Sequence, residues 1–136
     1  MKKILLILLL LPFFANAQIN DDFESGDISA WTQSESGRWE ADGDNPINGI
    51  YSLHHAFDNA DGGRDQVSIP INGIDISLGT VTWRFQVKHG YPPSGSNNWS
   101  CFLFSDSPAS EMYPSGAANG YAFGVNYSGT DDIIKI

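Results

Sequence analysis

The stretch "YAFGVNY", residues 121–127, decides the fold class because large and small side chains alternate along it. On an extended chain successive side chains point to opposite faces, so this alternation predicts a β-strand. The large face would carry Tyr121, Phe123, Val125 and Tyr127, and the small face Ala122, Gly124 and Asn126. A face of small side chains fits a concave surface or a closely packed neighbour.

Four upstream stretches and one downstream stretch extend the pattern. "WSCFLFS" (99–105) is apolar on both faces and predicts a central strand buried on both sides. "VTWRFQVK" (81–88) alternates as regularly as the opening stretch. "RWEAD" (38–42), "IYSLHHAF" (50–57) and the closing "DDIIKI" (131–136) are weaker strand candidates.

Glycine and proline interrupt the whole chain after residue 17. No stretch free of both is longer than twelve residues, so helices of ordinary length have little room while short strands fit. Turn dipeptides such as Asn48-Gly49 and Asn119-Gly120 recur between the strand candidates. The sequence therefore predicts an all-β fold, an antiparallel sandwich or barrel.

The N-terminus has the three parts of a secretory signal peptide. A basic start (Met1–Lys3) precedes eight apolar residues (Ile4–Leu11), and Ala15-Asn16-Ala17 is a small-x-small cleavage site. The apolar run is too short to span a bilayer, so no membrane insertion is expected. We predict a signal peptide over residues 1–17 and one β-sandwich domain over residues 18–136, secreted or held at the cell surface.

Charge and cysteine content narrow the function classes. The formal net charge is −9, which repels nucleic acid and anionic lipid and argues against both as partners. The single cysteine, Cys101, cannot form an internal disulfide and lies in an apolar strand candidate, so we expect an inert buried thiol.

The chain ends inside the strand candidate "DDIIKI". A sandwich that finished there would leave a strand edge exposed. We therefore expect a sandwich incomplete at its C-terminus, as the N-terminal part of a longer protein with further domains downstream.

The order of features in "DDFESGDISAWTQSESGRWEADG" (21–43) and "PINGIYSLHH" (46–55) resembles the start of MAM-type modules, which belong to the concanavalin A-like jelly-roll sandwiches. It is also similar to the N-terminal domains of large exported proteins of Gram-negative bacteria that carry lamin-tail-like repeats and a type IX sorting domain. The resemblance implies a two-sheet jelly roll with a non-catalytic adhesive or ligand-binding role. It also implies that the opening acidic residues, here Asp22 and Glu24, hold a cation that ties the first strand to a neighbouring loop.

Calcium is the candidate cofactor, because it takes six to eight oxygen ligands and the chain has three clusters rich in Asp, Asn and Glu. They lie at residues 21–24, 40–45 and 58–61, and none matches the EF-hand loop. Glu40, Asp42 and Asp44 would share one face of a strand, where three like charges favour a cation or open water. Besides Asp22 and Glu24, the secondary metal candidates are Asp42, Asp44, Asp58 and Asp61.

Glycan binding is the most specific ligand hypothesis. Trp31, Trp39 and Tyr91 lie near turns, where their rings would stack on sugars, and Arg64 would read hydroxyl groups. The loop "DNADGGRD" (58–65) is interpreted as a rim connection in which Arg64 pairs with Asp61 or Asp65. His54 and His55 would face opposite sides of one strand, and we interpret both as ordinary structural histidines.

These observations favour a secreted, non-catalytic jelly-roll module for adhesion or glycan binding, with an extracellular glycan or a cell-surface protein as partner. A glycan-active enzyme remains an alternative, although the Glu-x-Asp-x-x-Glu strand typical of jelly-roll glycosidases is missing. A purely structural domain of a multidomain surface protein is the third possibility.

Overall fold

The computed structural model describes residues 19–136 except 59–61, 76, 78, 93, 95–96, 127–133 and 136. Within these residues the chain is all-β, with seven short strands and one 3-10 turn, η1 (Ala109–Glu111). The predicted signal peptide, Asp61 and Tyr127 lie outside the described residues. No helix in the described part of the chain has the length and hydropathy that a membrane span requires.

The largest sheet is built from the stretch that decided the fold class. β6 (Gly120–Val125) pairs antiparallel with β5 (Trp99–Ser105) on one side and with β7 (Ile134–Lys135) on the other. The strand predictions at 99–105, 121–127 and 131–136 are therefore confirmed in their described parts. The prediction that β5 is central and buried on both sides is wrong, because β6 takes the middle position and most β5 side chains are half-buried.

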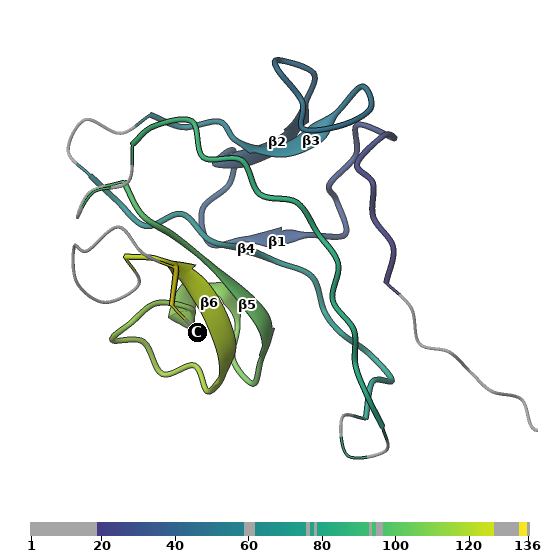
Figure 1. The fold of residues 1–136 in the computed structure, drawn as a ribbon, viewed down its shortest axis with the longest axis vertical. Helices are drawn as coiled ribbons and strands as arrows, with labels where there is room; N and C mark the ends of the chain where they lie inside the picture. The colour runs from purple at the N-terminus through teal and green to yellow at the C-terminus, as the bar shows by residue number, and fades with distance from the viewer. Residues whose placement is uncertain are drawn as a thin grey trace, which may run out of the picture.

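Two ribbons of two strands form the rest of the described strand structure (Figure 1). β2 (Trp39–Asp42) pairs antiparallel with β3 (Ser52–His55), which confirms strands within the candidates at 38–42 and 50–57. β1 (Thr32–Gln33) pairs with β4 (Val67–Ser68). The three sheets remain separate and do not close on one another.

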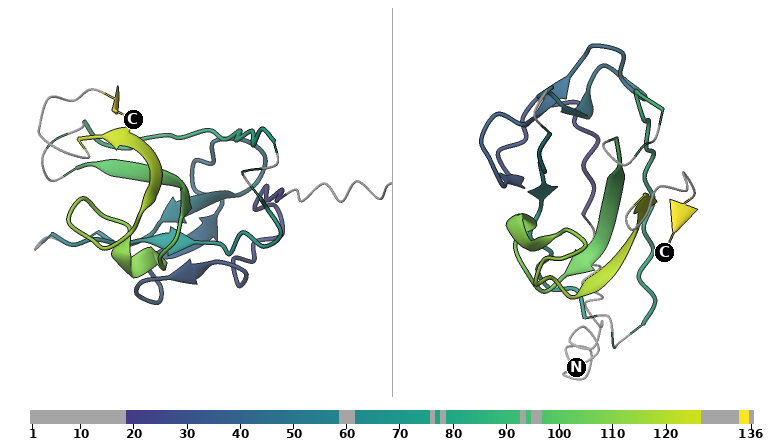
Figure 2. Two further views of the ribbon diagram at one scale, coloured as in Figure 1. Left: turned by 90° about the horizontal axis from the view of Figure 1, so that it is seen from below. Right: turned by 90° about the vertical axis from the view of Figure 1, so that its left-hand side faces the viewer.

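Residues 81–88 form no strand, so that prediction is wrong. The segment runs as a long coil across the molecule in Figure 1, and Figure 2 shows it beside the curved β5–β6 pair. Val81 and Trp83 are half-buried, whereas Phe85 and Val87 are 47% and 48% exposed. Alternation alone does not supply the partner backbone that a strand needs. The segment contacts the rest of the fold through the Phe85 ring on Phe123 and through Lys88 Nζ on the Asn45 carbonyl oxygen.

Most buried residues in the described part of the chain lie at or just after the end of β6. Val125 is 7% exposed and Asn126 is 4% exposed, while Ala109 of η1 is 2% exposed. The Phe123 ring stacks on Phe85 at 5.2 Å between centroids and meets Trp99 edge-on at 5.7 Å. An aromatic cluster over β5 and β6 is thus the main apolar contact of the described fold.

Candidate functional site

The acidic N-terminal segment is joined to a loop far along the chain by one carboxylate. The two oxygens of Glu24 each lie 3.0 Å from the amide nitrogen of Ile50, and Oε1 also accepts the Tyr51 amide at 3.3 Å. An ionised carboxylate that accepts backbone N–H groups makes stronger hydrogen bonds than a neutral acceptor. Glu24 therefore anchors the start of the domain to the turn before β3.

Gly49 makes this anchor possible. Its φ is +70°, a left-handed conformation that favours glycine, and a Cβ placed there would overlap the Glu24 carboxylate. The turn dipeptide Asn48-Gly49 thus serves two purposes: it reverses the chain and leaves room for the carboxylate to reach the amides.

Asp21 and Asp22 make local contacts in the same segment. Asp21 accepts the Phe23 amide at 3.0 Å and the indole N–H of Trp31 at 2.6 Å. Asp22 accepts the Glu24 amide at 3.1 Å. The tie that the family resemblance attributes to a cation is therefore made here by hydrogen bonds from backbone amides, and a cation at Asp22 and Glu24 remains a prediction.

A second cluster lies on the β2–β3 ribbon. Glu40 stands opposite His54 in the antiparallel register, and Asp42 is two residues along β2 on the same face. One ligand atom from each of the three side chains lies within 4.8 Å of the other two, and Asp42 Oδ2 is 3.4 Å from His54 Nδ1. The sequence indicated the two carboxylates but not the histidine, which only the strand register brings to them.

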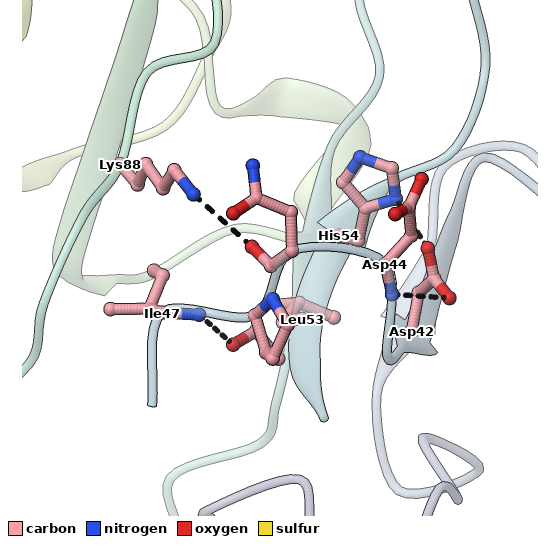
Figure 3. Close-up of a pocket in the computed structure, with 9 residues that line it drawn as sticks. Asp42, Asp44, Ile47, Leu53, His54 and Lys88 are labelled. Carbon is pink, nitrogen blue, oxygen red and sulfur yellow. Dashed lines mark hydrogen bonds and ion pairs between the residues drawn. The ribbon is translucent and has the colours of Figure 1, made fainter. Parts of the chain in front are cut away.

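The Asp42 carboxylate is held in one orientation. Its Oδ1 accepts the Asp44 amide at 3.1 Å, which leaves Oδ2 toward His54. Asp42, Asp44 and His54 also line a small pocket of about 70 Å³, shown in Figure 3. At its other side Lys88 Nζ donates to the Asn45 carbonyl oxygen at 3.2 Å.

His55 points away from this cluster, as the alternation of a strand predicts. Its Nε2 lies 2.8 Å from Asp65 Oδ2, and Asp65 also receives Arg38 Nε at 3.5 Å. The Asp65 side chain is only 10% exposed, so this ion-paired carboxylate sits inside the fold. Arg64 has its guanidinium over the Tyr113 ring at 4.6 Å, while Asp65 pairs with Arg38 and His55; the alternative pairing of Arg64 with Asp61 falls outside the described residues.

The candidate sugar-stacking residues occupy separate environments. Trp31 is half-buried against Phe23 at 5.6 Å, and Trp39 is half-buried against the His55 ring at 5.1 Å. Tyr91 is 67% exposed. Of the secondary metal candidates, Asp58 is exposed, and Asp61 lies outside the described residues.

The titratable groups with shifted pKa values have structural explanations. The backbone amide and hydroxyl of Ser29 lower the pKa of Asp27, and the amide and side chain of Asn119 do the same for Asp106. Cys101 is half-buried, not fully buried as the sequence suggested, and this partial burial raises the pKa of its thiol, which disfavours the reactive thiolate.

Comparison of the chain with protein-family models, with curated proteins and with solved structures finds no match in any of the three.

Proposed function

We propose that this chain is a secreted, non-catalytic module of the jelly-roll type that binds a glycan or a surface protein in adhesion. The all-β architecture of short antiparallel strands supports a sandwich module. The basic-apolar-small order of residues 1–17 supports export.

The observation that carries the binding role is the exposure of Tyr91. Tyr91 is 67% exposed, whereas the rings of Trp31 and Trp39 are engaged with Phe23 and His55. A large aromatic ring left in water is suited to stack on the apolar face of a sugar. Among the four predicted ligand-binding residues, Tyr91 is therefore the primary contact.

The non-catalytic part of the proposal rests on the missing Glu-x-Asp-x-x-Glu strand. A glycosidase needs two carboxyl groups across a cleft, one of them with a raised pKa. In the part of the chain that the structure describes, Asp27, Asp75 and Asp106 have lowered pKa values because they accept hydrogen bonds. These groups act as acceptors that shape loops.

We further propose that calcium reinforces the opening segment at Asp22 and Glu24. The ion would add oxygen ligation to a tie that already joins Glu24 to the Ile50 and Tyr51 amides. Thermal melting with calcium and then with a chelator should give a higher Tm with calcium. Identical curves would overturn the calcium proposal without affecting the glycan proposal.

A glycan array tests the binding function directly. The wild-type protein should bind one class of glycan, and Tyr91→Ala should lose at least tenfold in affinity. Tyr121→Ala is the matched control, because Tyr121 is 65% exposed on β6, and it should bind as the wild type does. Equal binding by the Tyr91 variant would contradict the proposal, and hydrolysis of a bound polysaccharide would favour the enzymatic alternative.

A further inference from the structure

We propose that Glu40, Asp42 and His54 form a binding site for a transition-metal ion of the zinc type. The site is separate from the opening acidic segment and does not depend on the proposed glycan binding. It differs in chemistry from the calcium candidates, because one of its ligands is an imidazole.

The antiparallel ribbon fixes the three side chains on one face. Glu40 and Asp42 are two residues apart on β2, and His54 is the register partner of Glu40 on β3. Side chains on the same face of paired strands lie close enough to bind one ion. The ribbon thus supplies two carboxylates and one histidine from two paired strands rather than from a loop.

The ligand set selects the class of metal. Calcium and magnesium bind oxygen, whereas zinc and its neighbours also accept imidazole nitrogen beside carboxylate oxygen. Three protein ligands with a fourth position open to water is a known arrangement for zinc. The presence of His54 therefore favours zinc over calcium at this place.

The distances fit this arrangement with little movement. Ligand bonds of about 2.0–2.2 Å to a tetrahedral ion place neighbouring ligand atoms about 3.4 Å apart. Asp42 Oδ2 and His54 Nδ1 are 3.4 Å apart. A carboxylate oxygen of Glu40 lies within 4.8 Å of the ligand atoms of Asp42 and His54. Because the Glu40 side chain is exposed, it can move the remaining distance toward a shared ion.

The surroundings of Asp42 are also those of a metal ligand. The Asp44 amide holds one carboxylate oxygen and leaves the other toward His54, an orienting contact of the kind that supports bound metals. Among the described residues, no lysine or arginine forms an ion pair with Glu40 or Asp42. A divalent cation would add positive charge beside these two carboxylates, one of which already contacts His54.

Zinc titration of the chelator-treated full chain by calorimetry tests the site, with calcium as the comparison ion. We expect one equivalent of zinc to bind and to raise Tm, and His54→Ala to weaken zinc binding at least tenfold. Cobalt should give the visible absorption of a low-symmetry site in the wild type, and Glu40→Gln and Asp42→Asn should each lower it.

His55→Ala is the matched control, because the neighbouring histidine has a similarly exposed side chain (42% against 51%) but points to Asp65. It should bind zinc as the wild type does. His89→Ala is a second control outside the ribbon. Circular dichroism of each metal-free variant verifies folding. Failure of the wild type to bind zinc, or equal binding by His54→Ala, would overturn the proposal.

Discussion

The β5–β6 sheet and the N-terminal half of the molecule are stabilised by different kinds of contact. The sheet pairs six positions of β5 with β6 and covers them with aromatic rings from Trp99, Phe123 and Phe85. The N-terminal half has only short ribbons, and carboxylates join its segments through backbone amides, as Glu24 does for Ile50 and Tyr51. Where the strand ladder is short, specific polar contacts replace it.

We expect the largest loss of stability from a substitution in the β5–β6 sheet. Phe123→Ala would remove the ring that joins Phe85 to Trp99, and should lower the free energy of unfolding by about 2–3 kcal/mol. Phe57→Ala is the control from the N-terminal half, where the ring lies 3.5 Å under the Arg38 guanidinium, and should cost about 1 kcal/mol. Urea unfolding measures both, and a larger loss for Phe57 would reverse the comparison.

The next effect concerns the room that Gly49 leaves for the carboxylate. Gly49→Ala should cost about 2 kcal/mol, because it adds a strained φ and pushes Glu24 off the two amides. Gly37 has a similar φ (+77°), but a Cβ there would meet no atom within 4 Å. Gly37→Ala should therefore lower the free energy of unfolding by only about 1 kcal/mol.

A double-mutant cycle separates the two causes. In a Glu24→Ala background, Gly49→Ala should cost no more than Gly37→Ala, since no carboxylate remains to be displaced. An unchanged cost in that background would show that Gly49 acts through its backbone conformation alone.

Much of this division was readable from the sequence, but not all of it. Alternation located β6, an apolar run between turns located β5, and weaker candidates marked the positions of β2 and β3. Alternation also predicted a strand at 81–88, which is wrong. Alternation shows that the two faces of a segment differ in polarity, but it does not show that a neighbouring strand is available for hydrogen bonding. The approach of His54 to Glu40 and Asp42 depends on register, which the sequence of a single strand does not contain.

The smallest effect is the acid sensitivity of the loop between β5 and β6. Asp106 accepts the Asn119 amide and side-chain N–H at 2.9 Å each, and these bonds hold its pKa below 3.8. Because the folded pKa is the lower one, the stabilisation is present above pH 3.8 and is lost as pH falls through the folded pKa.

Asp106→Asn should therefore be less stable than the wild type at pH 5, and the difference should shrink toward pH 2. Asp58→Asn, an exposed aspartate outside this loop, is the control in melts over the same range. A difference that stays constant with pH would show that the carboxylate charge plays no part.

Residue-resolved amide hydrogen exchange of the wild type and Glu24→Ala tests the central claim, that polar anchors hold one half and a ladder holds the other. We expect the Ile50 and Tyr51 amides to lose protection from exchange in the variant, while the amides of β5 and β6 keep theirs. Unchanged protection at Ile50 and Tyr51, or an equal loss in β5 and β6, would contradict it.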